Sequence, residues 1–169
     1  LKQLNTNAKY DKGDDYQPRI ATDDQGNWVA VWTSKDMLYY NMLETNIGTD
    51  ADILVQRSAD NGKTWTGVAP LNNDAFGDGK FDDAPALATD KAGMWLAVWD
   101  ADGGTTLPAI GFDGDLLIAR SEDNGATWTD PVPFNTNAET DGPYDYDTSV
   151  ELATDENGNW VAVWFSRHN

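Results

Sequence analysis

Residues 18–32 of the chain read PRIATDDQGNWVAVW, and the same pattern returns as PALATDKAGMWLAVW from residue 85 and as VELATDENGNWVAVW from residue 150. The three stretches align without a gap, and their starting points set a period of 65 to 67 residues. Self-similarity at a fixed period is the signature of a repeat architecture, in which each repeat is one unit of structure. We therefore expect several copies of one small supersecondary unit.

The repeat predicts short strands and no helix. Along residues 27–33, Trp28 and Trp32 lie on one face of an extended chain, and Val29 and Val31 lie on the other. Both faces are apolar, so a sheet that contains this strand must be covered on both sides. Stacking of such sheets around an axis gives a β-propeller. In the first repeat we expect four strands, at residues 19–22, 27–33, 52–58 and 64–71.

Two shorter segments between these stretches match each other. Residues 58–65 read SADNGKTW and residues 121–128 read SEDNGATW, both of the form Ser-x-Asp-x-Gly-x-Thr-Trp. We call them the Asp-box segments, since each resembles the Asp box, the bacterial neuraminidase repeat of sialidases and related propellers. The resemblance implies an all-β fold of sialidase-like β-propeller blades, each with four antiparallel strands. It gives a structural role to Ser58, Asp60, Gly62, Thr64 and Trp65, and to Ser121, Asp123, Gly125, Thr127 and Trp128.

The repeat divides residues 1–169 into about two and a half blades of a partial propeller. A blade of this family has four strands, and the family closes with more blades than the chain supplies. The partners that we expect are therefore further blades, from a longer chain or, as the alternative, from identical chains that assemble. The expected units are the last strand of a preceding blade at 1–8, blades at 18–75 and 85–138, and two strands of a further blade at 148–166.

The composition excludes several classes of partner. The chain carries 29 acidic and 11 basic residues, a formal charge of −18, which repels a nucleic-acid backbone. Its longest apolar run covers residues 160–165, whereas a membrane span needs about 20 residues. Cysteine is absent, so no disulfide or thiolate site can form. The acidity and the resemblance together predict a secreted protein, extracellular or periplasmic.

Paired carboxylates precede the third strand of each blade. Asp50-Ala-Asp52 matches Asp113-Gly-Asp115, and two carboxylates at this spacing can hold Ca²⁺. The alternative is that aspartate simply ends strands and begins turns. Calcium at Asp50, Asp52, Asp113 and Asp115 is the cofactor that we weigh, and the residues indicate no other.

Positions that break the repeat are candidates for ligand binding. Arg19 aligns with Ala86 and Glu151, and its surroundings resemble the motif that carries a substrate-binding arginine in sialidases. An arginine can hold a carboxylate through two hydrogen bonds, although a salt bridge to Glu151 is the alternative. Tyrosines in two expected loops could stack on sugar rings or pack on neighbouring loops. The candidate ligand-binding residues are Arg19, Tyr39, Tyr40, Tyr144 and Tyr146.

The resemblance implies a catalytic set that the chain does not contain. Sialidases use three arginines, a Tyr–Glu pair and an aspartate, whereas this chain has four arginines, of which Arg57 and Arg120 occupy repeated positions. We therefore expect no catalytic residue and no enzyme activity from this chain alone. The expected function is a binding or adhesion module, with glycans as ligands. The alternatives are part of a sialidase-like glycoside hydrolase with its catalytic residues elsewhere, and a structural propeller of a surface assembly or filament.

Overall fold

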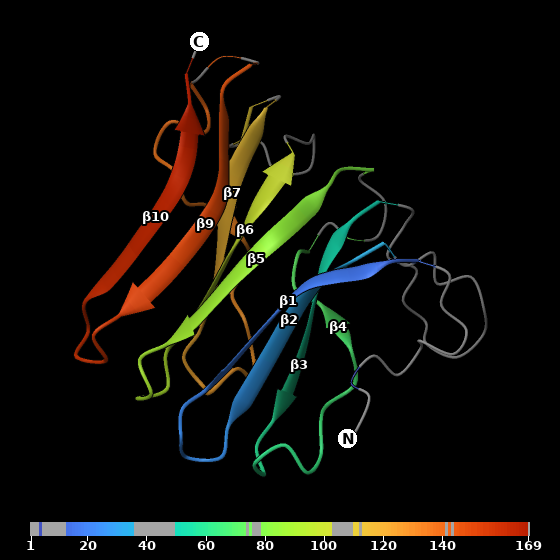
Figure 1. Cartoon of the computed structure of the whole chain (residues 1–169), viewed down its shortest axis with the longest axis vertical. Helices are drawn as coiled ribbons and strands as arrows, with labels where there is room; N and C mark the ends of the chain where they lie inside the picture. Colours follow the sequence, from blue (N-terminus) through green and yellow to red (C-terminus); the bar gives the residue numbers. More distant parts are fainter. Residues whose placement is uncertain are drawn as a thin grey trace.

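A computed structural model describes residues 4, 13–35, 50–73, 75, 79–102, 110–111, 113–140, 142 and 144–168. Every regular element in this part of the chain is a strand (Figure 1). The strands are β1 (Asp15–Thr22), β2 (Trp28–Ser34), β3 (Asp52–Ser58), β4 (Ala69–Pro70), β5 (Asp82–Thr89), β6 (Trp95–Asp102), β7 (Gly114–Ser121), β8 (Val132–Pro133), β9 (Tyr146–Thr154) and β10 (Trp160–Arg167).

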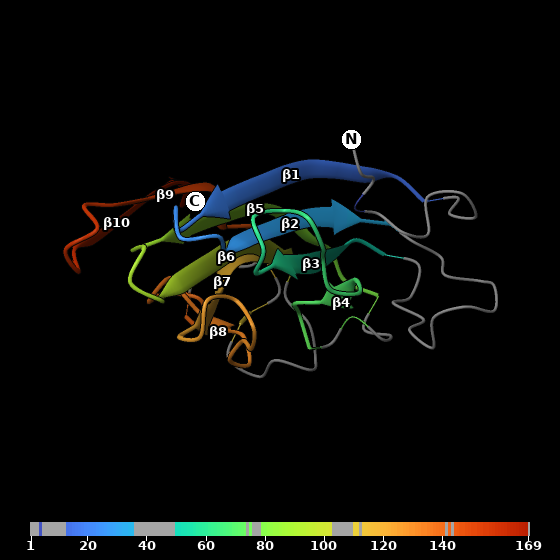
Figure 2. The ribbon, with the colours of Figure 1, turned by 90° about the horizontal axis from the view of Figure 1, so that it is seen from below.

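The strands form a four-stranded sheet and a six-stranded sheet, which together contain the three units of the repeat. Strands β1 to β4 pair in order and form the first blade, and β5 to β8 form the second in the same order. Strands β9 and β10 form the third, a two-stranded ribbon. Figure 2 shows that β1 to β4 and β5 to β8 succeed one another in the same direction. This order confirms the all-β fold of stacked, four-stranded blades.

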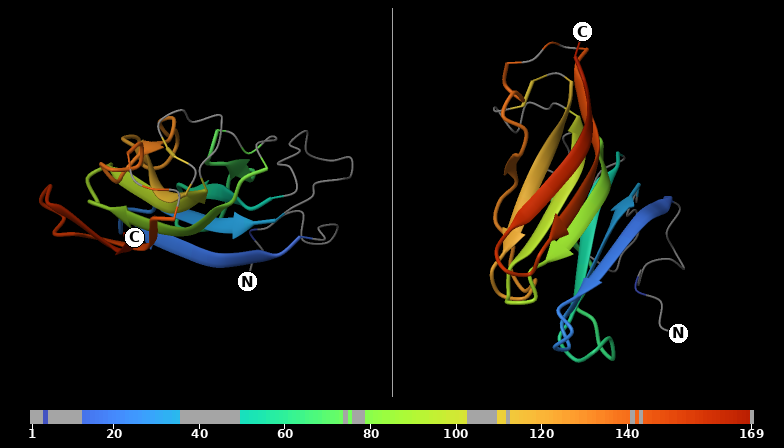
Figure 3. Two further views of the ribbon diagram at one scale, coloured as in Figure 1. Left: turned by 90° about the horizontal axis from the view of Figure 1, so that it is seen from above. Right: turned by 60° about the vertical axis from the view of Figure 1, so that its left-hand side comes forward.

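The first strands of the three blades lie side by side. Strand β5 lies between β1 and β9, as Figure 1 and the right-hand view of Figure 3 both show. We call β1, β5 and β9 the inner strands. A single parallel pair, Gly114 with Tyr146, also links β7 to β9. Residues far apart in the sequence therefore meet wherever equivalent ends of the inner strands come together.

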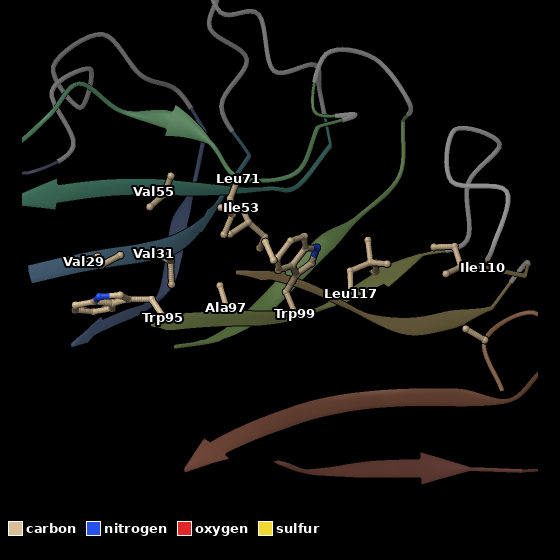
Figure 4. Packing of buried hydrophobic residues seen from close by; sticks show 13 residues of the cluster. Val29, Val31, Ile53, Val55, Leu71, Trp95, Ala97, Trp99, Ile110 and Leu117 are labelled. Atoms are coloured by element: carbon tan, nitrogen blue, oxygen red, sulfur yellow. The ribbon is translucent and has the colours of Figure 1, made fainter. Parts of the chain in front are cut away.

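The main core lies between the first and second blades. Val29 and Val31 of β2 face Trp95 and Trp99 of β6, and both tryptophans are fully buried (Figure 4). A second apolar cluster, which includes Val98 of β6, joins the second blade to the third. Replacing a buried tryptophan by alanine in such a core costs about 3–5 kcal/mol. Strand β6 therefore packs both of its apolar faces against neighbouring sheets, as the sequence predicts. Strand β2 packs its valine face against β6, whereas Trp32 on its other face packs with Leu54 of its own blade.

The outermost strand is shorter than expected. Residues 64–71 were expected to form a full strand, but β4 pairs with β3 only through Ala69 and Pro70. Thr64 and Trp65 belong instead to the Asp-box turn, and the Thr66 N–H donates to the Arg57 carbonyl as the turn closes. The expected strand at residues 1–8 lies outside the described residues, apart from residue 4. Among the described residues, no helix is long and apolar enough to cross a membrane.

Each inner strand carries a β-bulge close to its first residues. The pairing shifts between Tyr16 and Arg19 in β1 and at the equivalent places in β5 and β9. The bulged residues Gln17, Ala84 and Ser149 have φ values of 51°, 51° and 60°. A bulge bends its strand and turns its amides away from the ladder. Three such amides therefore lie along one edge of the stacked blades.

Candidate ligand site at the start of the inner strands

The bulged edge gathers residues that break the repeat. The starts of the inner strands lie beside the ends of β2, β6 and β10, as the pairs Asp15–Ser34, Asp82–Ala101 and Tyr146–Arg167 show. We call the described side chains that meet here the edge cluster: Tyr16, Thr33, Lys35, Phe81, Asp83, Asp100 and Asp102.

Two carboxyl groups lie at the centre of the edge cluster. Asp83 of β5 is directly opposite Asp100 of β6, so their side chains share one face of the sheet. The Thr33 hydroxyl lies 3.1 Å from Asp83 Oδ1, to which it can donate a hydrogen bond. Burial, with a smaller contribution from the negative charge of Asp83, raises the pKa of Asp100 to about 7. One carboxyl of the pair is thus partly protonated near neutral pH.

Amides of the bulges hold the polar groups of the edge cluster in place. The Ser149 N–H donates to both carboxylate oxygens of Asp100, at 3.0 and 3.1 Å, and this bond partly offsets the rise in the pKa of Asp100. The Ala84 N–H donates to Gln17 Oε1 at 2.9 Å. Both bonds run from one blade to its neighbour. The stacking of blades therefore fixes side chains that neither blade orients alone.

A lysine lies against two aromatic rings beside the carboxyl pair. Lys35 Nζ is 5.5 Å from the ring centre of Tyr16 and 5.2 Å from that of the exposed Phe81, within cation–π range. Burial and the charge of Asp83 raise the pKa of Tyr16, while Lys35 opposes the change. Burial also raises the pKa of Asp102. The positive charge of Lys80 lowers this pKa, and the negative charge of Asp83 raises it. Aromatic faces and hydrogen-bond acceptors thus stand together at one exposed edge.

Arg19 does not join the edge cluster. It is half-buried in β1 and donates from Nη1 to the Pro18 carbonyl at 3.3 Å. The side chain lines a groove of about 350 Å³ with Ile20 and Trp32. Within the described residues it forms no ion pair, so the alternative salt bridge to Glu151 is not formed. A ligand role for Arg19 stays a prediction.

The four candidate tyrosines divide into two groups. Tyr144 and Tyr146 are exposed, and Tyr146 begins β9 at the edge where the inner strands start. Tyr39 and Tyr40 lie outside the described residues. Their role in ligand binding stays a prediction.

The candidate metal residues are buried in repeated polar networks. Asp50, Asp52, Asp113 and Asp115 are all buried. Asn72 Nδ2 donates to Asp52 Oδ1 at 2.8 Å in the first blade and to Asp82 Oδ2 of the next at 3.1 Å. In the described part of the chain, no group of three or more His, Cys, Asp or Glu side chains has metal-binding geometry. Calcium therefore stays a prediction, and the hydrogen bonds show the Asn72 amide linking Asp52 of the first blade to Asp82 of the second.

The sequence prediction missed the residues of the edge cluster. Tyr16, Asp83 and Thr148 occupy equivalent positions, and so do Thr33, Asp100 and Phe165. Within each set the three residues differ in chemical type, although the residues around them match closely from one repeat to the next. Comparing the repeats position by position at the strand starts would have found these residues, whereas the candidates singled out on the inner strands were Arg19 and Tyr146.

The Asp-box segments lie at the opposite edge. Each is joined to the turn between the first two strands of its own blade, because the Asn61 N–H donates to the Gly26 carbonyl and the Asn124 N–H to the Gly93 carbonyl. The segments are therefore remote from the edge cluster.

Comparisons with known proteins agree with the stacked blades. No protein-family model matches the chain. A sialidase of Paraclostridium sordellii is 31% identical over 93 residues, which are 51% of this chain and 23% of that protein. A Hadza microbial sialidase superposes with a TM-score of 0.57 at 18% identity, over 86% of this chain and 36% of its own. A Penicillium chrysogenum α-L-arabinanase complexed with arabinobiose gives 0.53 at 12% identity, over 92% and 42%.

The chain thus spans less than half the length of each of these proteins. The solved structures share its fold, and the curated sialidase also shares its sequence over about half of the chain. The chain thus has the fold of sialidase-like β-propeller blades.

Proposed function

We propose that these blades carry a glycan-binding site of a secreted β-propeller, and that the ligand lies on the edge cluster. The observation that carries the proposal is the contact of Lys35 with both Tyr16 and Phe81, beside the carboxyl groups of Asp83 and Asp102. Because exposed aromatic faces and fixed polar groups occur together there, the edge has the two features that a sugar requires: apolar contact and oriented hydrogen bonds.

Each part of the edge cluster has a defined part in binding. The exposed ring of Phe81 packs against the C–H face of a sugar ring, while Asp83 and Asp102 accept hydrogen bonds from its hydroxyls. The Ser149 and Ala84 amides hold neighbouring acceptors in place before the ligand arrives, which reduces the entropy lost on binding. The similar proteins, two sialidases and an arabinanase complexed with arabinobiose, support carbohydrates as the ligand class.

The proposal is tested by binding measurements on the chain and two matched variants. A glycan array identifies a ligand, and calorimetry then measures its affinity. Phe81→Ala should weaken binding by about five- to thirtyfold, because an aromatic contact of about 1–2 kcal/mol is lost. Phe165→Ala removes another exposed phenylalanine, from β10, and should leave the affinity unchanged. Equal affinities of wild type and Phe81→Ala, or no glycan bound at all, would reject the edge cluster as a glycan site.

A second candidate function is glycoside hydrolysis by the complete protein. Asp83 and Asp100 are adjacent carboxyl groups, and the pKa of Asp100 is raised to about 7, which suits a general acid at neutral pH. Fluorogenic sialosides and arabinofuranosides would be assayed with the chain alone and within its longest natural form. We expect turnover only in the longer form, where Asp100→Asn should reduce kcat by at least about 100-fold. Unchanged kcat in that variant would leave binding as the role of the pair.

A further inference from the structure

The turns between the first and second strands of the three blades carry alternating charges. Asp24, Lys91 and Glu156 occupy equivalent positions and share a left-handed backbone, with φ of 61°, 59° and 62°. Lys91 Nζ lies 2.7 Å from Asp24 Oδ2 and 2.9 Å from Glu156 Oε1. One lysine thus bridges both neighbouring blades, and the two ion pairs between adjacent turns each join opposite charges.

An apolar face of β10 has the pattern of a blade interface. Val161, Val163 and Phe165 form this face, which we call the β10 face, and they are 60%, 61% and 59% exposed. Their counterparts in the first blade, Val29 and Val31, are 0% exposed because the tryptophans of β6 cover them. The β10 face therefore repeats a surface that is fully covered elsewhere in the same molecule.

We propose that the β10 face docks a further four-stranded sheet of the same kind, and that this sheet presents a lysine or arginine at the turn position of Lys91. The apolar part of the fit follows from continuity with the interface between the first two blades. The charge follows from Glu156, whose carboxylate holds Lys91 on one side and is half-exposed on the other. A basic residue there extends the alternation by one blade.

The same geometry disfavours a second copy of this chain as the occupant. The first blade of a copy would bring Asp24 against Glu156, and like charges at this position repel. An alternating series closes into a ring without such a contact only when the number of blades is even. Because exposed ion pairs change affinity only a few-fold, the turn charges select among similar blades while the apolar face supplies the adhesion.

The test pairs the wild-type chain with a charge-inverted chain, Asp24→Lys, Lys91→Glu and Glu156→Lys. Each chain keeps opposite charges internally, but in a mixture Glu156 of the wild-type chain meets the lysine that replaces Asp24 in the charge-inverted chain. Association is measured by sedimentation velocity of each chain alone and of the mixture at low salt. We expect the mixture to associate at least about fivefold more tightly than either chain alone, and the difference to vanish in about 0.5 M NaCl.

Val163→Asp in both chains serves as the second variant, with circular dichroism to verify folding. It should abolish association in the mixture, since it places a charge in the β10 face. Equal association of the mixture and of the separate chains would overturn selection by charge. Association that persists with Val163→Asp, or its absence from every sample, would overturn docking at the β10 face.

Discussion

The two Asp-box segments have the same internal hydrogen bonds but different surroundings. In both, the serine hydroxyl accepts the glycine N–H, at 2.9 Å in the first segment and 2.8 Å in the second. In both, the aspartate accepts the threonine N–H at 2.8 Å. Eight residues of nearly the same sequence thus build the same turn twice. The turn is therefore a local product of its own residues.

The position in the stack makes the two segments unequal. Gly125 is buried against Val29 and Arg57 of the first blade, whereas a side chain at Gly62 would meet nothing within 4 Å. Trp65 Nε1 donates to the Gly62 carbonyl at 3.2 Å. Trp128 packs on the core between the blades instead, and within the described residues its indole N–H has no acceptor. The same motif is a surface turn in one blade and part of an interface in the next.

The largest expected effect comes from adding a methyl group to each glycine. Gly62→Ala and Gly125→Ala share a strained left-handed backbone, with φ of 77° and 78°, which costs about 1–2 kcal/mol. Only Gly125→Ala also overlaps Val29, which should raise its cost to about 2–4 kcal/mol. Urea unfolding measures both. Val29→Ala should relieve part of the Gly125→Ala cost in a double-mutant cycle, and additive effects would break the comparison.

The second largest difference in stability is expected between the arginines that precede the two Asp-box segments. Arg57 Nε donates to the Asn124 carbonyl of the neighbouring blade at 2.6 Å, and Nη2 donates to Asn27 Oδ1 at 3.0 Å. Arg120 holds the equivalent position but is exposed. Arg57→Ala should lower the free energy of unfolding by about 1–3 kcal/mol, and Arg120→Ala by less than about 0.5 kcal/mol. Equal losses in thermal unfolding would contradict a role for Arg57 in joining the blades.

A smaller and symmetric effect is expected in acid. Hydrogen bonds from the threonines hold the pKa of Asp60 and of Asp123 at about 2, below the ordinary 3.8. A folded pKa below the unfolded one contributes stability that is complete above about pH 4 and is lost as the pH falls toward 2. Asp60→Asn and Asp123→Asn should therefore destabilise at pH 6, by a margin that shrinks toward pH 2. Unfolding series at several pH values should give similar curves, since a marked difference would mean that burial also governs the turn.

The smallest effect concerns calcium at the paired carboxylates. If Asp50 and Asp52 in the first blade and Asp113 and Asp115 in the second hold Ca²⁺, millimolar Ca²⁺ should raise the unfolding temperature and a chelator should reverse the rise. Asp113→Asn removes a carboxylate from the second blade alone. The part of the Ca²⁺-dependent rise in unfolding temperature that this variant loses would show whether both blades respond to Ca²⁺. An unfolding temperature that is independent of Ca²⁺ would remove the metal prediction.

The repeat predicted the first three strands of the first blade, although β1 begins at Asp15 and not at residue 19 as expected. The third strand, β3, lies where residues 52–58 were expected, and its apolar run at residues 53–55 is typical of a strand that is covered on both faces. The predicted fourth strand at residues 64–71 was wrong at its start, because Thr64 and Trp65 belong to the Asp-box turn and the Thr64 N–H donates to Asp60. The pairing of Asp83 with Asp100 was missed, since it depends on strand register across β5 and β6. The hydrogen bond from the Ser149 N–H to Asp100 was also missed, because Ser149 belongs to the neighbouring blade.

The sequence by itself determined the blade, its turns and the need for neighbours, because these depend on contacts within one period and on two apolar faces that cannot stand in water. Only the tertiary structure decided which copy of each motif is buried. Gly62 and Gly125, or Val31 and Val163, are equivalent in sequence but differ in what lies against them. Stacking also brought Lys35 to Phe81 and Lys91 to its two carboxylates. Such contacts between blades depend on distance in space, which the internal repeat does not encode.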